Sequence, residues 1–216
     1  MHKLVPIPNL LKHKEDDSLF IIGGGPSLTD FDWSILKNKN VLVLNRALEK
    51  VPNAIAVFWN DVTFHQNHQE ELSKFGGVRI STTRYSLSHT CDCNIIWVKG
   101  NSYTSDMNGP IEESPYTIRQ GSNTGYSALN VAYHLGAKTI YLLGYDMNLN
   151  EGKTNWHDGY KNEVPNNNRT RLNNIFIQQF NGVKKTYLEK GIKIYNLNVD
   201  SNLKEFETKA IEKVLA

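Results

Sequence analysis

The chain has 216 residues, 39% of them apolar, a size and composition that predict one α/β domain with a sizeable core. Lys and Arg outnumber Asp and Glu by only 24 to 22, which argues against a dedicated nucleic-acid binder. No stretch approaches the ~20 apolar residues of a membrane span, and residues 1–17 lack the apolar core of a secretory signal. We therefore expect a cytoplasmic protein without a membrane span.

The cysteines agree with a reducing compartment. Cys91 and Cys93 are the only two in the chain and lie one residue apart. That spacing is poor for a mutual disulfide, and no second cluster completes a zinc site. Two reduced thiols near a strand are the expected state.

Short apolar runs alternate with helix-like segments, which is the pattern of parallel strands joined by helices. Strands are expected at residues 19–22, 41–44, 54–59, 78–80, 95–98, 139–143 and 192–195. Several of these runs are apolar on both faces, as in strands buried between two helix layers. The prediction is a Rossmann-like, mostly parallel sheet with helices on both faces, forming a single nucleotide-binding domain over residues 1–216.

The helices are predicted by their apolar spacing and their stop signals. They are expected at residues 61–74, 124–135, 171–190 and 205–215, with Gly136 and Gly191 ending the second and third. Residues 99–121 and 148–170 fit neither pattern. Long polar segments beside strand ends are often functional, and residues 148–170 are predicted to form a lid loop.

A glycine-rich turn follows the first strand and is the leading candidate for a ligand site. Gly23, Gly24 and Gly25 permit close approach of the backbone to a phosphate or ribose, while Pro26 stiffens the exit and Ser27 is placed to cap a helix. Neither the dinucleotide-binding pattern nor the P-loop is met. A merely tight turn is the alternative.

Polar residues also follow the second and third strands. Asn45 comes directly after the former, and Asn60 with Asp61 after the latter. Ligands bind at this end of open α/β sheets, and an amide can pair with a base edge or a ribose hydroxyl. Helix capping is the alternative role for each amide.

A second polar cradle precedes the helix at residues 124–135. Ser122, Asn123, Thr124 and Gly125 are small or polar residues at the start of that helix, and Arg119 offers a positive charge for a phosphate. An ordinary capped helix start explains the same residues.

Two further positions carry chemistry that a transferase needs. Asp146 follows the strand at residues 139–143, and His157 lies in the predicted lid, where a histidine can act as a base near neutral pH. An idle surface histidine is the alternative. His65 and His68 have the spacing of metal ligands, but no third ligand accompanies them.

Taken together, three segments resemble a known group of proteins: Leu-Phe-Ile-Ile-Gly-Gly-Gly-Pro-Ser-Leu at 19–28, Ser-Asn-Thr-Gly at 122–125 and Leu-Leu-Gly-Tyr-Asp at 142–146. They look like the bacterial sialyltransferases of the Campylobacter type. They also look like the phage and bacterial proteins grouped with archaeal 6-hydroxymethylpterin diphosphokinase, with the phage members nearest. The resemblance spans roughly residues 19–195.

The sialyltransferase resemblance implies a cytidine nucleotide sugar at Gly24, Gly25, Ser27, Asn45 and Asn60. It implies further donor contacts from residues 122–125, His157 as the general base, and no metal. The pterin enzyme implies instead transfer of diphosphate from ATP with magnesium, which would be held by the three following carboxylates: Asp61, Asp146 and Asp158.

Three functions follow as hypotheses. The first is a metal-independent nucleotide-sugar glycosyltransferase whose acceptor is a glycan, a small molecule or a modified nucleic acid. The second is a magnesium-dependent diphosphotransferase. The third is a non-catalytic nucleotide-binding protein. The sequence leaves the donor sugar, the acceptor and self-association into a homo-oligomer open.

Overall fold

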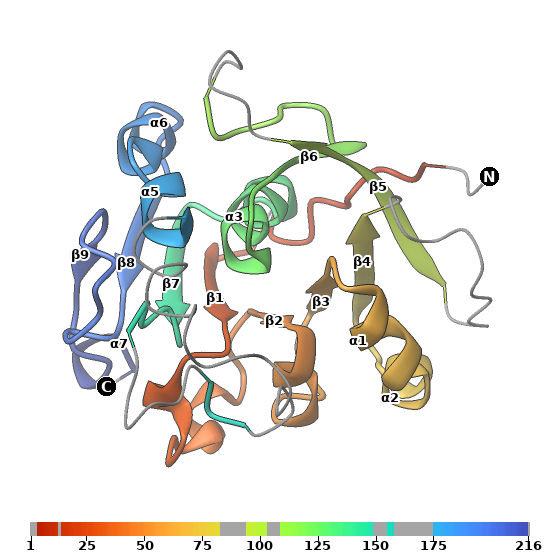
Figure 1. Ribbon diagram of the computed structural model, residues 1–216, viewed down its shortest axis with the longest axis horizontal. Coiled ribbons are helices and arrows are strands. Elements are labelled where there is room, and N and C mark those ends of the chain that lie inside the picture. The colour runs from red at the N-terminus through yellow and green to blue at the C-terminus, as the bar shows by residue number, and fades with distance from the viewer. Residues whose placement is uncertain are drawn as a thin grey trace.

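The computed structural model describes residues 4–12, 14–82, 94–102, 109–148, 155–157 and 175–215 (Figure 1). Cys91, Cys93 and Asp158 lie outside these residues, as does most of the predicted lid. In the described part, one sheet of nine strands has the order β6-β5-β4-β3-β2-β1-β7-β8-β9, and every pair of neighbours is parallel. The predicted Rossmann-like α/β fold is therefore confirmed.

The strands are β1 (Ser18–Ile22), β2 (Val41–Leu44), β3 (Ala56–Trp59), β4 (Val78–Thr82), β5 (Ile95–Ser102), β6 (Thr117–Gln120), β7 (Thr139–Leu143), β8 (Lys193–Asn196) and β9 (Glu207–Thr208). The α-helices are α1 (Val62–Asn67), α2 (Gln69–Lys74), α3 (Thr124–Leu135), α5 (Ile177–Gln179), α6 (Val183–Glu189) and α7 (Glu212–Leu215). Three short 3-10 helices are η1 (Pro26–Leu28), η2 (Trp33–Leu36) and η3 (Asn45–Glu49).

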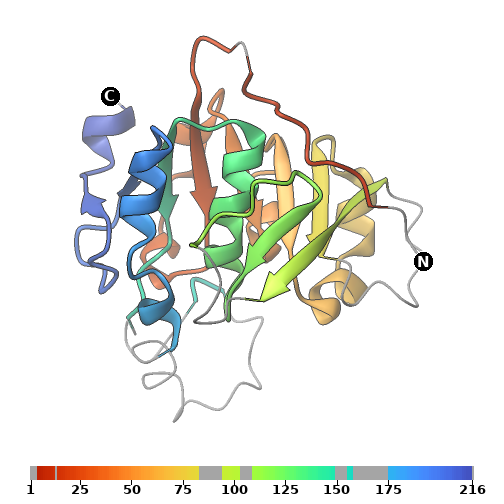
Figure 2. The same cartoon turned by 90° about the horizontal axis from the view of Figure 1, so that it is seen from above.

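Apolar side chains on both faces of the sheet explain why it is covered twice. Along β1, Leu19 and Ile21 belong to one buried cluster with α3 and α6, whereas Phe20 and Ile22 belong to a second cluster with η1–η3, α1 and α2. Figure 2 shows α3 and α6 on one side of the sheet and α1 and α2 on the other. Because full burial of each such side chain contributes about 1.5–3 kcal/mol, the two layers stabilise the sheet from both sides.

The strand order reverses between β1 and β7, and this place in the sheet is its topological switch point. From β1 the chain builds outward through β2 to β6, then returns through α3 to β7 on the other side of β1 and continues to β8 and β9. Parallel strands whose connections leave in opposite directions open a crevice at their carboxyl ends. The glycine turn, which follows β1, and residues 144–146, which follow β7, both lie there.

All seven predicted strands are present, and their bounds either match the prediction or differ from it by one to four residues. Strands β6 and β9 have no counterpart among the predicted strands. The β6 segment is Thr-Ile-Arg-Gln, whose polar residues hide its role, and it is fixed by pairing with β5 and by Asn130 of α3, which accepts a hydrogen bond from Arg119 N. Pairing partners and contacts from distant segments, rather than local pattern, make this strand.

One predicted helix is confirmed with its exact bounds, and the others differ from the prediction. Residues 124–135 form α3 as predicted, and Gly136 ends it with a left-handed φ of 95°. The single helix predicted at 61–74 is divided at His68. Of the helix predicted at 171–190, residues 171–174 lie outside the described residues, and the rest is interrupted at Gly182, whose φ is 79°. The helix predicted at 205–215 is wrong for its first half, which holds β9 because Glu207 and Thr208 pair with β8.

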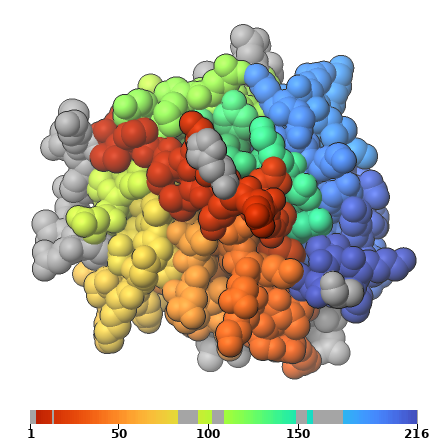
Figure 3. Space-filling view, turned by 180° about the vertical axis from the view of Figure 1, so that it is seen from behind, coloured from red at the N-terminus to blue at the C-terminus, as the bar shows by residue number. Residues whose placement is uncertain are grey.

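The N-terminal segment crosses the molecule on the face seen in Figure 3, where it runs in red. Its backbone donates from Val5 N to Trp97 O at 3.3 Å, from Ile7 N to Pro115 O at 2.9 Å and from Leu11 N to Leu135 O at 2.9 Å. Ile7 and Leu11 are buried in the same cluster as α3. The segment therefore fastens β5 and the end of α3 to one another.

Burial of His134 predicts a specific dependence of stability on pH. The side chain is 7% exposed, and burial lowers its pKa despite hydrogen bonds to the backbone of Thr117 and Glu112. The unfolded chain therefore binds a proton near pH 6.5 that the folded chain takes up only at lower pH. The free energy of unfolding should fall as pH drops through that window, by at most about 1.4 kcal/mol per pH unit. His134→Gln should flatten the profile between pH 6.5 and 5 in urea titrations, and parallel profiles would contradict the prediction.

Candidate functional site

The glycine turn after β1 is fastened directly to the end of β7. Gly23 N donates to Leu143 O at 2.8 Å, and Gly25 N donates to Gly144 O at 2.9 Å. Gly144 has a φ of 69°, a left-handed conformation that glycine adopts without strain. The two loops of the switch point are therefore one hydrogen-bonded unit.

Two of the three glycines are required by close packing against the loop that follows β7. A Cβ on Gly25 would lie 2.5 Å from Asp146 Oδ2 and 2.7 Å from Gly144 O, and one on Gly23 would lie 2.8 Å from Gly144 O. A Cβ on Gly24, in contrast, would meet only the side chain of Asn155, at 2.8 Å from Oδ1. Gly23 and Gly25 thus permit the approach of the β7 loop, and Gly24 permits the approach of the segment that carries Asn155.

Asp146 closes this junction from the far side. It is 2% exposed and accepts from Ser27 N at 2.7 Å, from Ser27 Oγ at 2.6 Å and from Asn198 Nδ2 at 2.8 Å. A buried carboxylate is tolerated only when donors satisfy it, and here three do. Asp146 and Ser27, both predicted as donor-binding residues, hold the junction together.

The N-terminus of α3 forms the opposite wall of the crevice. Asn123 caps the helix, since its Oδ1 accepts from Tyr126 N at 2.8 Å, so Thr124 and Gly125 occupy the first turn. Tyr145 packs on Gly125, where a Cβ would lie 2.9 Å from the ring, and its hydroxyl donates to Gly125 O at 3.0 Å. Burial raises the pKa of Tyr145, which keeps this hydroxyl a donor.

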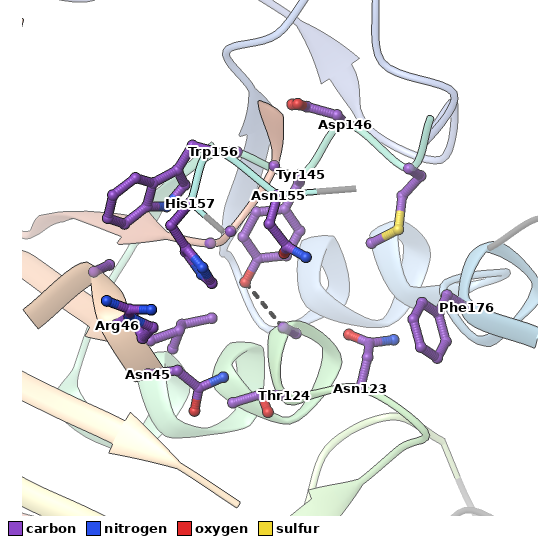
Figure 4. A pocket seen from close by; sticks show the side chains of 18 of the residues that line it. Asn45, Arg46, Asn123, Thr124, Tyr145, Asp146, Asn155, Trp156, His157 and Phe176 are labelled. Atoms are coloured by element: carbon purple, nitrogen blue, oxygen red, sulfur yellow. Dashed lines mark hydrogen bonds between the residues drawn. The ribbon is translucent and has the colours of Figure 1, made fainter. Parts of the chain in front are cut away.

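Between these walls lies a cavity of about 300 Å³ (Figure 4). That volume is at the lower end of the range of small-molecule sites. Its lining residues come from the switch point, the start of η3, the start of α3 and the segment 155–157: Gly23, Gly24, Gly25, Leu44, Asn45, Arg46, Ala47, Asp61, Asn123, Thr124, Gly125, Gly144, Tyr145, Asp146, Met147, Asn148, Asn155, Trp156, His157 and Phe176.

Three buried polar atoms around this cavity lack a hydrogen-bond partner in the described part of the chain. They are the acceptor Asn45 Oδ1 and the donors Asn123 Nδ2 and Trp156 Nε1. Leaving a buried polar group unpaired costs about 1–3 kcal/mol, so the fold gives up stability beside this cavity.

The backbone is also strained at this cavity. Asn45 has a φ of 48° and Met147 a φ of 51°, and these are two of the three non-glycine residues described with positive φ. Each such residue costs on the order of 1 kcal/mol or more and is concentrated at functional sites in proteins. Strain and unpaired atoms therefore coincide at Asn45.

The segment 155–157 is docked on the glycine turn. Trp156 N donates to Gly24 O at 3.0 Å, and the indole ring packs edge-on against Trp33 with a centroid distance of 5.8 Å. Lys50 Nζ lies 5.4 Å from the same indole centroid. These contacts bring His157 to the cavity, where Figure 4 shows its ring pointing inward below Trp156.

Most of the predicted site residues meet at this cavity, but several do not. Asn60 instead borders a much smaller neighbouring cavity with Thr82 and donates to Ser127 Oγ at 3.4 Å. Arg119, 4% exposed, forms an ion pair with Glu112 at 2.7 Å, away from the cavity.

Three other predicted site residues lie near the cavity without lining it. Pro26 and Ser27 lie behind the turn without lining the cavity, and the backbone of Ser122 donates to Gln179 Oε1 at 2.8 Å. Asp61 lines the cavity but also caps α1, accepting from Thr63 N at 2.6 Å.

Several residues that line the cavity were not among the predicted site residues. Arg46 directly follows Asn45, so its position next to a strand end was the signal available. Phe176 and Asn155 gave no such signal, because only tertiary packing brings them to the crevice. Among the described residues, no group of three His, Cys, Asp or Glu side chains has the arrangement of a metal site, and no described helix is long and apolar enough to cross a membrane.

Comparisons with known proteins give no relative for this chain. No family model, no curated protein and no solved structure matches it. The geometry of the cavity, together with the sequence motifs, is therefore the basis for any assignment of function.

The two kinds of glycine contact predict opposite effects of alanine substitution. Gly25 has a φ of −63°, so Gly25→Ala is unfavourable through its clash with Asp146 and Gly144, and should lower the free energy of unfolding by about 1–3 kcal/mol. Gly24→Ala meets only the movable end of Asn155 and should leave that free energy nearly unchanged. Urea unfolding of both variants tests the distinction, and equal losses would refute it.

Proposed function

We propose that the protein is a nucleotide-sugar-dependent glycosyltransferase that holds its donor in the cavity at the switch point. The observation that carries the proposal is the convergence on one cavity of three unpaired buried polar atoms and of a histidine. The resemblance of the glycine turn, the α3 start and the β7 loop to the sialyltransferase group points to the same class of ligand.

The unpaired atoms suit the polar edges of a nucleoside. Asn45 Oδ1 accepts one hydrogen bond, while Asn123 Nδ2 and Trp156 Nε1 each donate. The aromatic rings of Trp156 and Phe176 also line the cavity and offer flat apolar surfaces to a base or a sugar ring. Figure 4 shows these two rings at opposite sides of the site.

The first turn of α3 suits the phosphate of the donor. Thr124 and Gly125 line the cavity at the N-terminus of a twelve-residue helix, where backbone N–H groups and the helix dipole favour an anion. The donor would thus lie between the glycine turn and α3.

His157 is the proposed general base. It would take the proton of an acceptor hydroxyl as that oxygen attacks the anomeric carbon of the donor sugar, while the bond from that carbon to the phosphate oxygen breaks and the nucleotide leaves. No residue of the chain need bond covalently to the sugar in this single displacement.

The two candidate magnesium ligands that the structure describes, Asp61 and Asp146, favour this reaction over magnesium-dependent diphosphate transfer. Asp146 is satisfied by three donors from Ser27 and Asn198, and Asp61 Oδ1 accepts from two backbone amides of α1. Neither is arranged as a dedicated ligand for a cation that bridges phosphate oxygens.

A thermal-shift screen tests the proposal. Nucleosides, nucleotides and nucleotide sugars would each be added with magnesium and with EDTA, since a ligand that binds only the folded state raises its melting temperature. We expect the largest shift from a nucleotide sugar, equal under both conditions. A shift that requires both ATP and magnesium would support the diphosphotransferase, and no shift with any compound would overturn nucleotide binding.

Asn45→Gly should separate ligand binding from stability. Glycine adopts the left-handed backbone of this position without strain, so stability should be unchanged or rise by up to about 1 kcal/mol. Loss of the amide should weaken binding of the nucleotide sugar by about 1–3 kcal/mol. Calorimetric titration and urea unfolding measure the two effects, and an unaltered dissociation constant would remove Asn45 from the site.

His157→Ala should lower turnover by about 10²–10⁴-fold, the usual contribution of a positioned general base. Donor affinity should barely change, because the base acts on the acceptor. Donor consumption in the presence of a panel of glycan acceptors measures turnover, and calorimetry measures affinity. Wild-type turnover in the variant would contradict the assignment of His157 as the general base. Parallel loss of donor affinity and turnover would instead make His157 a donor contact.

A further inference from the structure

Arg46 brings a positive charge to the cavity that the sequence motifs did not identify. It is the second residue of η3, directly after the strained Asn45. Among the described residues that line the cavity, it is the one Lys or Arg side chain. Figure 4 shows it on the same side as His157, away from Asn123 and Phe176.

Glu49 holds the guanidinium of Arg46 by two hydrogen bonds within η3. Arg46 Nε lies 2.6 Å from Glu49 Oε1, and Arg46 Nη2 lies 3.1 Å from Glu49 Oε2. This bidentate geometry fixes the plane of the guanidinium, because its five N–H donors have a rigid arrangement and Glu49 takes one edge of it.

His68 supports Glu49 from behind. Its Nε2 lies 3.3 Å from Glu49 Oε1, its Nδ1 lies 3.0 Å from Phe64 O, and its ring stacks on Phe64 at a centroid distance of 4.4 Å. His68 is also the residue that divides α1 from α2. The break in the predicted helix thus coincides with a connection from α1 through η3 to the cavity.

The charges of this chain of contacts favour a persistent ion pair. Partial burial raises the pKa of Glu49, but the hydrogen bond and charge of Arg46, together with His68, lower it below its usual value. Both side chains of the Arg46–Glu49 pair are 29% exposed, and such a pair adds at most about 1 kcal/mol to stability. Orientation of Arg46 is a better account of the arrangement than stability.

We propose that Arg46 binds an anionic group of the ligand in the cavity, and that Glu49 and His68 are positioning residues for its guanidinium. The proposal rests on the proposed function in taking that group to be the phosphate of a nucleotide. The positive end of α3 lines the same cavity at Thr124 and Gly125, so the cavity as a whole carries charge that favours an anionic ligand. Arg46 thereby makes the site selective for phosphorylated nucleosides over bare nucleosides.

Calorimetric titration with cytidine, cytidine 5′-monophosphate and inorganic pyrophosphate tests this assignment. Arg46→Gln should weaken binding of the monophosphate by about 10–100-fold, the range for hydrogen bonds to a charged group, and leave cytidine within about 3-fold. Arg46→Lys should recover part of the loss, because it keeps the charge but not the bidentate geometry. Thermal unfolding of each variant verifies the fold.

A mutant cycle tests the positioning role. Glu49→Gln should weaken monophosphate binding by a smaller factor, about 3–10-fold, and have no further effect in the Arg46→Gln background. His68→Gln should behave in the same way. The matched control is Glu70→Gln, which removes one partner of the exposed Glu70–Lys74 pair of α2 and should change no affinity.

The outcomes separate this inference from the proposed function. Unchanged monophosphate affinity in Arg46→Gln would overturn the assignment while leaving nucleotide binding intact. Equal effects of Glu49→Gln with and without Arg46 would overturn the positioning role. Pyrophosphate binding that depends on Arg46 would support the anion site even where the thermal-shift screen finds no nucleotide, a result that overturns the glycosyltransferase alone. Binding of neither pyrophosphate nor the monophosphate by the wild-type protein would overturn the anion site.

Discussion

The carboxylate of Asp146 accepts three hydrogen bonds at the point where the strand order reverses, and the site depends on them. Two come from Ser27, after β1, and one comes from Asn198, after β8, so a single buried charge joins three strand ends around β7. Burial of an unpaired carboxylate costs several kcal/mol, which makes these donors obligatory. The approach of the turn to this carboxylate in turn requires that Gly25 have no side chain.

Stability has been lost elsewhere around the same cavity. Asn45 combines a left-handed backbone with a buried acceptor that no described residue satisfies, and Asn123 and Trp156 each leave a donor unpaired. These features together cost on the order of several kcal/mol, a large part of the net stability of a typical domain. Folding alone gives no reason to retain them, and natural proteins keep such costly features mainly at functional sites.

The sequence predicted the parts of this protein whose signal is local. Apolar runs predicted all the central strands, and the capped start and glycine stop of α3 gave that helix its correct bounds. The pattern failed where distant contacts decide: β6 is polar in sequence and is held by β5 and Asn130, and β9 is defined by its pairing with β8.

The candidate site divides in the same way. Strand-end position correctly brought Asn45 and the glycine turn together, because parallel strands share a carboxyl edge. The same reasoning failed for Arg119, whose charge is taken by Glu112, and for Asn60, which turns toward a neighbouring cavity. Position along a strand predicts which edge a residue reaches. It does not predict which partner the side chain finds there.

The glycine turn also determines how the two halves of a reaction would be placed relative to each other. Trp156 N donates a hydrogen bond to Gly24 O, so the segment that carries His157 is attached to the turn proposed to hold the donor. On the opposite side of the turn, Ser27 and Asp146 fix it to β7, the strand that leads to Tyr145 and, through its hydroxyl, to the start of α3. The proposed base, the proposed donor site and the N-terminus of α3 are thereby connected by hydrogen bonds through the glycine turn and the end of β7. General-base catalysis requires the base to lie within hydrogen-bonding reach of the reacting hydroxyl, and attachment of the proposed base and the proposed donor site to the same turn fits that requirement.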